Sequence, residues 1–225
     1  MTVSRIGPGR PVDPTKDRDI LAAGRKILFG QGPQGVSMEA VARAAGVAKP
    51  TLYRRFANRD RLVEAIVESE AERMAGRFRL APGNAGDLRG SLQAFGIDLA
   101  RFLISDEHVG FIHALGASTG MPQALRETIF RHGPLNTRNR LAAWLEKAHQ
   151  SGLLACPRPE FSAERFLGML MGLDLVRTLY HVADESSGED LSARVRSIVD
   201  DFLRLHHPTE SPDQLRSESM SMTKR

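Results

Sequence analysis

Two short segments of apolar periodicity, joined at a glycine, constrain the fold of this chain more than any other feature of its sequence. They lie between Ser37 and Arg59, and Gly46 separates them. Apolar residues of the first segment recur three or four positions apart, as on one helix face: Met38, Val41, Ala42 and Ala45. In the second segment Leu52 and Phe56 are four positions apart and can pack inward. Two short helices joined by a glycine-containing turn form the helix-turn-helix pattern.

The second of these segments is basic and polar on the side opposite Leu52. The helical period turns Pro50, Thr51 and Arg54 outward and places Lys49, Tyr53 and Arg55 on the flanks. Arg and Lys can bond the edge of a guanine, and Tyr and Thr hydroxyls can bond phosphate oxygens. The pattern therefore predicts a DNA-facing second helix.

The distribution of charge agrees with this prediction. Residues 1–60 hold 11 Lys/Arg against 5 Asp/Glu, whereas residues 61–225 hold 20 against 22. The basic surplus lies with the helix-turn-helix segment, as binding to the phosphate backbone requires. A solvated basic face without a ligand would give the same count, so charge alone leaves both readings open.

The rest of the chain also has helical periodicity, and the fold class predicted is all-α with about nine to ten helices. We expect a first helix over 16–31, stopped at Gly32, and a longer one from Asn58 to about residue 80. Further helices are expected over 87–105, 107–118 and 121–132, then from Pro134 to Gly152, over 166–182, and from residue 191.

These elements predict two domains between two irregular ends. Residues 1–15 form a flexible basic arm, and residues 16–62 form the DNA-binding domain, whose connecting helix continues to about residue 80. Residues 87–206 form a second helical domain, and the Pro- and Ser-rich tail over 207–225 is expected to be disordered.

Enzymatic and metal chemistry find no support in the sequence. The run from Gly30 to Gly35 matches G-x-G-x-x-G, but a helix precedes it and Pro33 interrupts it, so we expect an inter-helix loop. HExxH and P-loop motifs are absent. The single cysteine, Cys156, lacks the neighbours of a nucleophile, and His206-His207 reads as a helix end. We predict no enzyme activity, no metal and no cofactor.

Nothing near the N-terminus has the apolar core of a signal peptide. The apolar run 167–176 is too short to span a bilayer. These features favour a cytoplasmic protein without a membrane partner.

The first quarter of the chain resembles the DNA-binding domain of the TetR family of bacterial transcriptional regulators. The resemblance lies in these residues: Ile20–Ala23, Gly32, Val36–Met38, Val41-Ala42, Ala45–Val47, Thr51–Tyr53, Phe56 and Leu62. Two departures are Pro33, where the family has an aromatic residue, and Ala48, where it has a small hydroxyl. The sequence from Arg131 to Pro134 is similar to a helix junction in one subgroup.

The resemblance implies DNA contacts residue by residue. The recognition-helix positions that meet the major groove and its phosphates correspond to Lys49, Pro50, Thr51, Tyr53, Arg54 and Arg55. Ser37 and Met38 match the phosphate-contacting start of the preceding helix, and Arg59 matches a backbone clamp. Within this set we expect Lys49 and Arg54 to read bases, and Thr51, Tyr53 and Arg59 to hold the backbone.

The resemblance also implies a homodimer and a small-molecule effector. We place the dimer interface within 162–206, because the apolar helix there has more than one apolar face. Candidate effector-pocket residues are Phe102, His108, Phe111, Leu115, Phe130, Trp144 and Met169, with His113 as a further polar contact. Apolar residues at helical spacing are more often core, so that alternative stays open.

The function predicted is a ligand-responsive regulator: a repressor that binds a pseudo-palindromic DNA operator as a dimer and is released by a small molecule. An activator with the same DNA-binding domain is one alternative. A helical ligand-binding or interaction protein that does not bind DNA is another, and Lys49, Tyr53, Arg54 and Arg59 argue against it.

Overall fold

The computed structural model describes residues 14–74, 82–117, 121–180, 182 and 190–208. Every regular element within these ranges is helical, so the all-α prediction is confirmed there. The expected arm, apart from residues 14 and 15, and the expected tail beyond residue 208 lie outside the described residues. None of the described helices is long and apolar enough to cross a lipid bilayer.

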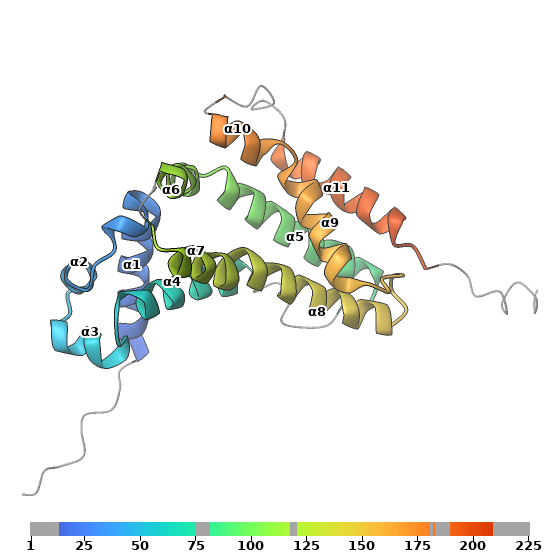
Figure 1. Ribbon diagram of the computed structural model, residues 1–225. Coiled ribbons are helices and arrows are strands. Elements are labelled where there is room, and N and C mark those ends of the chain that lie inside the picture. The colour runs from blue at the N-terminus through green and yellow to red at the C-terminus, as the bar shows by residue number, and fades with distance from the viewer. Residues whose placement is uncertain (1–13, 75–81, 118–120, 181, 183–189, 209–225) are drawn as a thin grey trace, which may run out of the picture.

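The N-terminal part contains four helices at one end of the molecule (Figure 1). They are α1 (Pro14–Gly35), α2 (Met38–Ala44), α3 (Lys49–Arg55) and α4 (Arg59–Met74). Side chains cap two of these helices: Ser37 Oγ accepts the N–H of Ala40, and Asn58 Oδ1 accepts the N–H of Arg61. The predicted α2–α3 turn contains Gly46 with a φ of 64°. The expected extension of α4 beyond Met74 lies outside the described residues.

Helix α1 is longer than predicted and is kinked at the expected stop. It runs to Gly35, but Gly32 has a φ of 72° and a ψ of 176°, a conformation that is essentially restricted to glycine. The segment expected to be a plain inter-helix loop is therefore a kinked helix end. A helix and not a strand precedes the fingerprint match, so the match lacks the strand-to-helix turn of a dinucleotide-binding site.

The middle of the chain contains α5 (Ala85–Leu103), α6 (Asp106–Ala117), α7 (Gln123–Phe130) and α8 (Asn136–Gln150). A π-helical turn, η2 (Arg131–Leu135), joins α7 to α8 without a break. The prediction that Pro134 opens a separate helix is wrong. Proline has no N–H to donate, and the wider π turn allows the helix to continue past it.

The C-terminal part contains α9 (Pro159–Met171), α10 (Asp174–Tyr180) and α11 (Leu191–Leu205). The single apolar helix expected over 166–182 is wrong, because Gly172 interrupts it with a φ of 48°. Helix α11 begins where predicted, with the Asp190 carboxylate accepting the N–H of Ser192.

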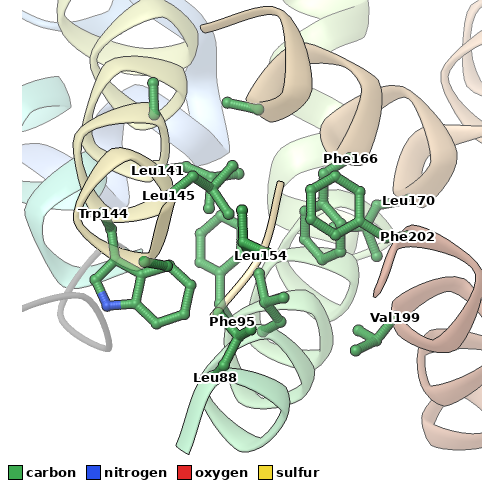
Figure 2. Close-up of a cluster of buried hydrophobic side chains, with 14 of the residues drawn as sticks. Leu88, Phe95, Leu141, Trp144, Leu145, Leu154, Phe166, Leu170, Val199 and Phe202 are labelled. Carbon is green, nitrogen blue, oxygen red and sulfur yellow. The ribbon is translucent and has the colours of Figure 1, made fainter. Parts of the chain in front are cut away.

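Two hydrophobic clusters hold these helices together. The first, called the regulatory core, is formed by α5, α8, α9 and α11, and Figure 2 shows its packed side chains. Phe166 packs edge-on against Phe202 at 5.0 Å between ring centroids and stacks with Phe95 at 6.3 Å. Burial of such aromatic rings contributes about 2–3 kcal/mol each.

The second cluster, called the junction core, joins the helix-turn-helix to the rest of the chain. It contains the predicted inward residues Val41 and Leu52 and Ile20 of α1, but also Phe111 of α6 and Ile129 of α7. The hydrophobic core of the first four helices thus continues into α6 and α7, although these helices are distant in sequence.

Candidate nucleic-acid interface and effector region

One side of α3 is buried and the other is open. Leu52 is fully buried in the junction core, whereas Lys49, Pro50, Tyr53 and Arg54 are exposed. Thr51, which was also predicted to face outward, is half-buried. The open face therefore carries an ammonium, a guanidinium and a phenol, which are groups that donate to base edges and phosphates.

The start of α2 presents backbone donors rather than side chains. Ser37 caps the helix through its hydroxyl, and the side chain of Met38 is buried. The first-turn N–H groups of a helix have no intrahelical partner and suit an anion. Met38 could therefore meet a phosphate through its N–H, as the family resemblance implies, and not through its side chain.

Lys49 is held by a carboxylate on α2. Its Nζ lies 3.3 Å from Glu39 Oε1, and both side chains are more than half exposed. The pKa of Glu39 is lowered, first by a hydrogen bond from its own backbone N–H and then by Lys49. An exposed pair of this kind contributes little to stability, but it limits the directions that the Lys49 ammonium can take.

Arg55 points into the protein and not toward the open face. Its guanidinium forms an ion pair with Asp17 of α1, and its side chain is 7% exposed. The sequence placed Arg55 among the DNA contacts, but in this geometry its side chain joins α3 to α1. The helical period could not reveal this, because Asp17 is 38 positions away.

Arg59 reaches back to the connection between α1 and α2. Its Nε donates to the carbonyl of Val36 at 2.8 Å, and its Nη2 donates to the carbonyl of Pro33. The side chain is one-third exposed. Two of its donors hold the loop that orients α2, so in this structure the predicted backbone clamp is engaged within the protein.

Part of the predicted effector set gathers around one residue that the sequence did not single out. Phe29 of α1 packs against Phe102 of α5 at 5.6 Å and against Phe111 of α6 at 5.0 Å between ring centroids. His108 lies 4.5 Å from Phe102, and Leu115 packs beside the same core. Phe29 lies in the first predicted helix, and nothing in its local pattern distinguishes it from ordinary core.

His108 is the unusual member of this aromatic group. Its Nδ1 is shielded from solvent and has no hydrogen-bond partner among the described residues. Burial lowers the pKa of His108 from 6.5 to about 4, against a smaller opposing effect of Glu70. The imidazole is therefore neutral near pH 7, and its Nδ1 can accept or donate one hydrogen bond according to the tautomer.

The other predicted pocket residues do not join this group. Trp144 is buried in the regulatory core, and Met169 packs against it from α9. Phe130 is 59% exposed at the end of α7. For Trp144 and Met169 the core alternative describes the packing better than a shared pocket does.

His113 links two helices instead of facing a ligand. Its Nε2 lies 2.6 Å from the carbonyl oxygen of Thr178, which joins α6 to α10. This distance requires the tautomer in which Nε2 carries the proton.

The groups considered for catalysis have structural roles in the described residues. Burial raises the pKa of the Cys156 thiol, which disfavours the nucleophilic thiolate. His206 ends α11, and its Nε2 pairs with the Ser162 hydroxyl at 2.9 Å. Within the described residues, no three His, Cys, Asp or Glu side chains form a metal-ligand cluster.

Comparison with known proteins identifies two domains of one kind of regulator. Residues 20–66 match the family described as bacterial regulatory proteins, tetR family. Residues 90–208, more than half of the chain, match the family described as AefR-like transcriptional repressor, C-terminal domain.

Relatives with curated names match parts of the chain. The HTH-type transcriptional regulator UidR of Escherichia coli is 36% identical over 66 residues, which are 29% of this chain and 33% of UidR. An uncharacterized HTH-type transcriptional regulator of Mycobacterium tuberculosis, Rv1556, is 26% identical over 140 residues, or 60% of this chain and 65% of that protein.

Solved structures match nearly the whole fold. The Flavonoid-responsive Regulator FrrA is 25% identical with a TM-score of 0.62, and the match covers 88% of this chain and all of FrrA. A TetR transcriptional regulator from Agrobacterium tumefaciens is 24% identical with a TM-score of 0.66, covering 87% of this chain and 95% of the other. These relatives are transcriptional regulators rather than enzymes. Taken with the helix-turn-helix and the helical domain behind it, they show that the chain belongs to the TetR family of bacterial transcriptional regulators.

Proposed function

We propose that this regulator is a repressor that binds a pseudo-palindromic DNA operator as a homodimer and leaves it when a small molecule binds. The open face of α3, with Lys49, Tyr53 and Arg54 exposed above a buried Leu52, carries this proposal. In it, Lys49 and Arg54 read base edges, while Thr51, Tyr53 and the first-turn N–H groups of α2 meet the phosphates. Such binding takes place in the cytoplasm, where bacterial DNA lies.

A second copy of the chain is the proposed cover for an apolar surface at the C-terminal end. Helix α10 buries none of its side chains within one subunit, and its exposed residues are apolar: Leu175, Val176, Leu179 and Tyr180. Phe161 of α9 and Leu205 of α11 are also exposed. Apolar surface of this extent favours a partner, and the two-fold axis of a dimer matches the two halves of a palindrome.

A small molecule is the proposed signal, with the aromatic group of Phe29, Phe102, His108 and Phe111 as its candidate contact. This group includes residues of α1 and α6 and lies in the same hydrophobic core as the helix-turn-helix. A ligand there could favour one arrangement of α6 and the helix-turn-helix over another. The name of FrrA describes a response to flavonoids, and its similarity supports an aromatic effector for this chain.

Selection of bound duplexes from a random DNA library tests the proposal. We expect the winners to share a two-fold symmetric site, and we expect a salt titration of the best one to show affinity falling steeply with ionic strength. Arg54→Ala should relax the base preference in a repeat of the selection. The DNA-binding proposal fails if no duplex is enriched, and the dimer geometry fails if the enriched site lacks two-fold symmetry.

A further inference from the structure

Helices α1 and α6 meet along a seam of three matched contacts. The partners are spaced by four and then three positions on both helices, which places each set on one helix face. From the start of the seam to its end the pairs are Arg25 with Glu107, Phe29 with Phe111, and Gly32 with Ala114. The contacts therefore follow one another in the same order along both helices, and we call these six residues the α1–α6 seam.

A branched ion pair closes the first end of the seam. Arg25 Nη1 donates to Glu107 Oε2 of α6 at 2.9 Å, and its Nε donates to Glu70 Oε2 of α4 at 3.0 Å. Glu70 is buried and also accepts from Arg73. Burial acts to raise the pKa of Glu70, but the hydrogen bonds from Arg73 and Arg25 outweigh it and leave that pKa lowered. Arg25 is thereby fixed on α4 while its other donor holds α6.

The other two contacts of the seam leave α6 little freedom to slide along α1. The guanidinium of Arg25 covers the ring of Phe29 at 5.2 Å, and that ring packs on Phe111. At Gly32, a Cβ atom would lie 2.6 Å from the Cβ of Ala114, so only glycine permits this approach. A shift of α6 by one residue would lose the ion pair and create a clash at the other end.

Beyond the seam, α6 is tied to the helix with the exposed apolar face. His113 bonds the Thr178 carbonyl of α10, and Figure 1 shows α6 between α1 and α10. In the other direction, Asp17 of α1 holds Arg55 of α3. A continuous path of packed and paired residues thus runs from α10 through α6 and α1 to the recognition helix.

We propose that the α1–α6 seam, closed by Arg25 and Glu107, sets the separation of the two recognition helices and so selects the half-site spacing of the operator without touching DNA. This inference rests on the proposed function, because spacing has meaning only for a dimer on a two-part site. One inserted base pair displaces a half-site by about 3.4 Å and turns it by about 34°. A stiff seam resists that change, whereas a loosened one lets each DNA-binding domain follow its half-site.

Glu107→Lys is the most direct test, because it replaces the exposed partner of Arg25 and leaves the ion pair of Arg25 with the buried Glu70 in place. The DNA ligands are the selected operator, the same operator with one or two base pairs added or removed at its centre, and a single half-site. We expect the wild type to prefer its own spacing by about tenfold or more, and we expect Glu107→Lys to reduce that preference to about threefold or less.

Glu146→Lys is the matched control, because it makes the same charge change at an exposed site of α8, a helix that contributes no residue to the seam. It should strengthen binding to every duplex similarly and keep the wild-type spacing preference. Ala114→Leu is a second variant, which places a larger side chain against Gly32 and leaves the charges of the seam unchanged. It should also weaken the spacing preference.

The outcomes separate this inference from the function on which it rests. If Glu107→Lys and Ala114→Leu both retain the wild-type spacing preference, the seam does not set the spacing. The same conclusion follows if the wild type binds its palindrome but tolerates every spacing. If the wild type enriches no duplex at all, the proposed function fails and this inference fails with it.

Discussion

Two neighbouring arginines on the last turn of α3 illustrate how differently adjacent residues are used. Arg54 is exposed on the open face, whereas the Arg55 side chain is almost fully enclosed beside Asp17. Both fit the basic pattern of a recognition helix, and only the packing of α1 against α3 separates them. Their roles should therefore separate in experiment.

Replacing these arginines one at a time distinguishes a DNA contact, Arg54, from a residue that joins α3 to α1, Arg55. Arg54→Ala should leave the free energy of unfolding unchanged and lower discrimination at one operator base pair by about 1–3 kcal/mol. Arg55→Ala should lower the free energy of unfolding by about 1–2 kcal/mol, because it removes the packing of an almost fully enclosed side chain together with its ion pair. Urea unfolding and operator titration of both variants measure this, and equal unfolding energies for the two would contradict it.

His108 should make stability depend on pH. Its pKa is lowered from 6.5 to about 4 in the folded protein, so the unfolded chain binds the proton first as the pH falls. This group therefore lowers the free energy of unfolding between about pH 7 and pH 4, by about 2 kcal/mol at pH 5. His108→Phe, which keeps a ring among the aromatic residues, should remove that part of the pH dependence in urea titrations. An identical slope in the variant would show that His108 is not shielded.

At the scale of elements, the helices begin largely where the periodicity predicts. The breaks and kinks between and within them differ from those predicted. Gly32 bends α1, a π turn joins α7 to α8 past Pro134, and Gly172 separates α9 from α10. An apolar run continues across Gly172, so its pattern alone indicates one helix. The break turns α10 away from the regulatory core and leaves its apolar side chains exposed.

The conformation at Gly172 should be costly for any other residue. A Cβ added there meets no atom within 4 Å, so the positive φ is the only obstacle. Gly172→Ala should lower the free energy of unfolding by about 1–2 kcal/mol. Gly90 of α5 is equally unobstructed but lies within a helix, and Gly90→Ala should raise it by about 0.5–1 kcal/mol. Thermal unfolding of both variants measures whether the free energy of unfolding falls for Gly172→Ala and rises for Gly90→Ala. Stabilisation by Gly172→Ala would contradict this account.

At the scale of the whole molecule, the two hydrophobic cores do not follow the order of the chain. The regulatory core joins α5, α8, α9 and α11, whereas α6 and α7 contribute to the junction core with the first four helices. The DNA-binding helices are therefore packed against the second domain on a shared apolar surface. This arrangement provides a physical route by which events in one part could alter the other.

The exposed face of α10 should control self-association. Leu179→Glu should not unfold the chain, because the side chain is already 52% exposed, but it places a charge where a second copy would pack. We expect it to sediment as a monomer and to bind the full operator more weakly than the wild type. Ile104→Glu alters an exposed apolar residue outside α9–α11 and should preserve both properties. A Leu179→Glu protein that remains dimeric would rule out α10 as the contact.

The sequence by itself determined the all-helical class, the helix-turn-helix and its inward and outward faces, because these follow from periodicity and capping within one or two turns. It also indicated that Pro50 and Arg54 of α3 face solvent. Only the tertiary structure decided that Arg55 and Arg59 bind within the protein, that Trp144 is core, and that Arg25 meets Glu107. The partners of Arg55 and Arg59 lie 23 to 38 positions away in the chain, and Glu107 lies 82 positions from Arg25. No local pattern encodes contacts over such separations, because they depend on how whole helices pack.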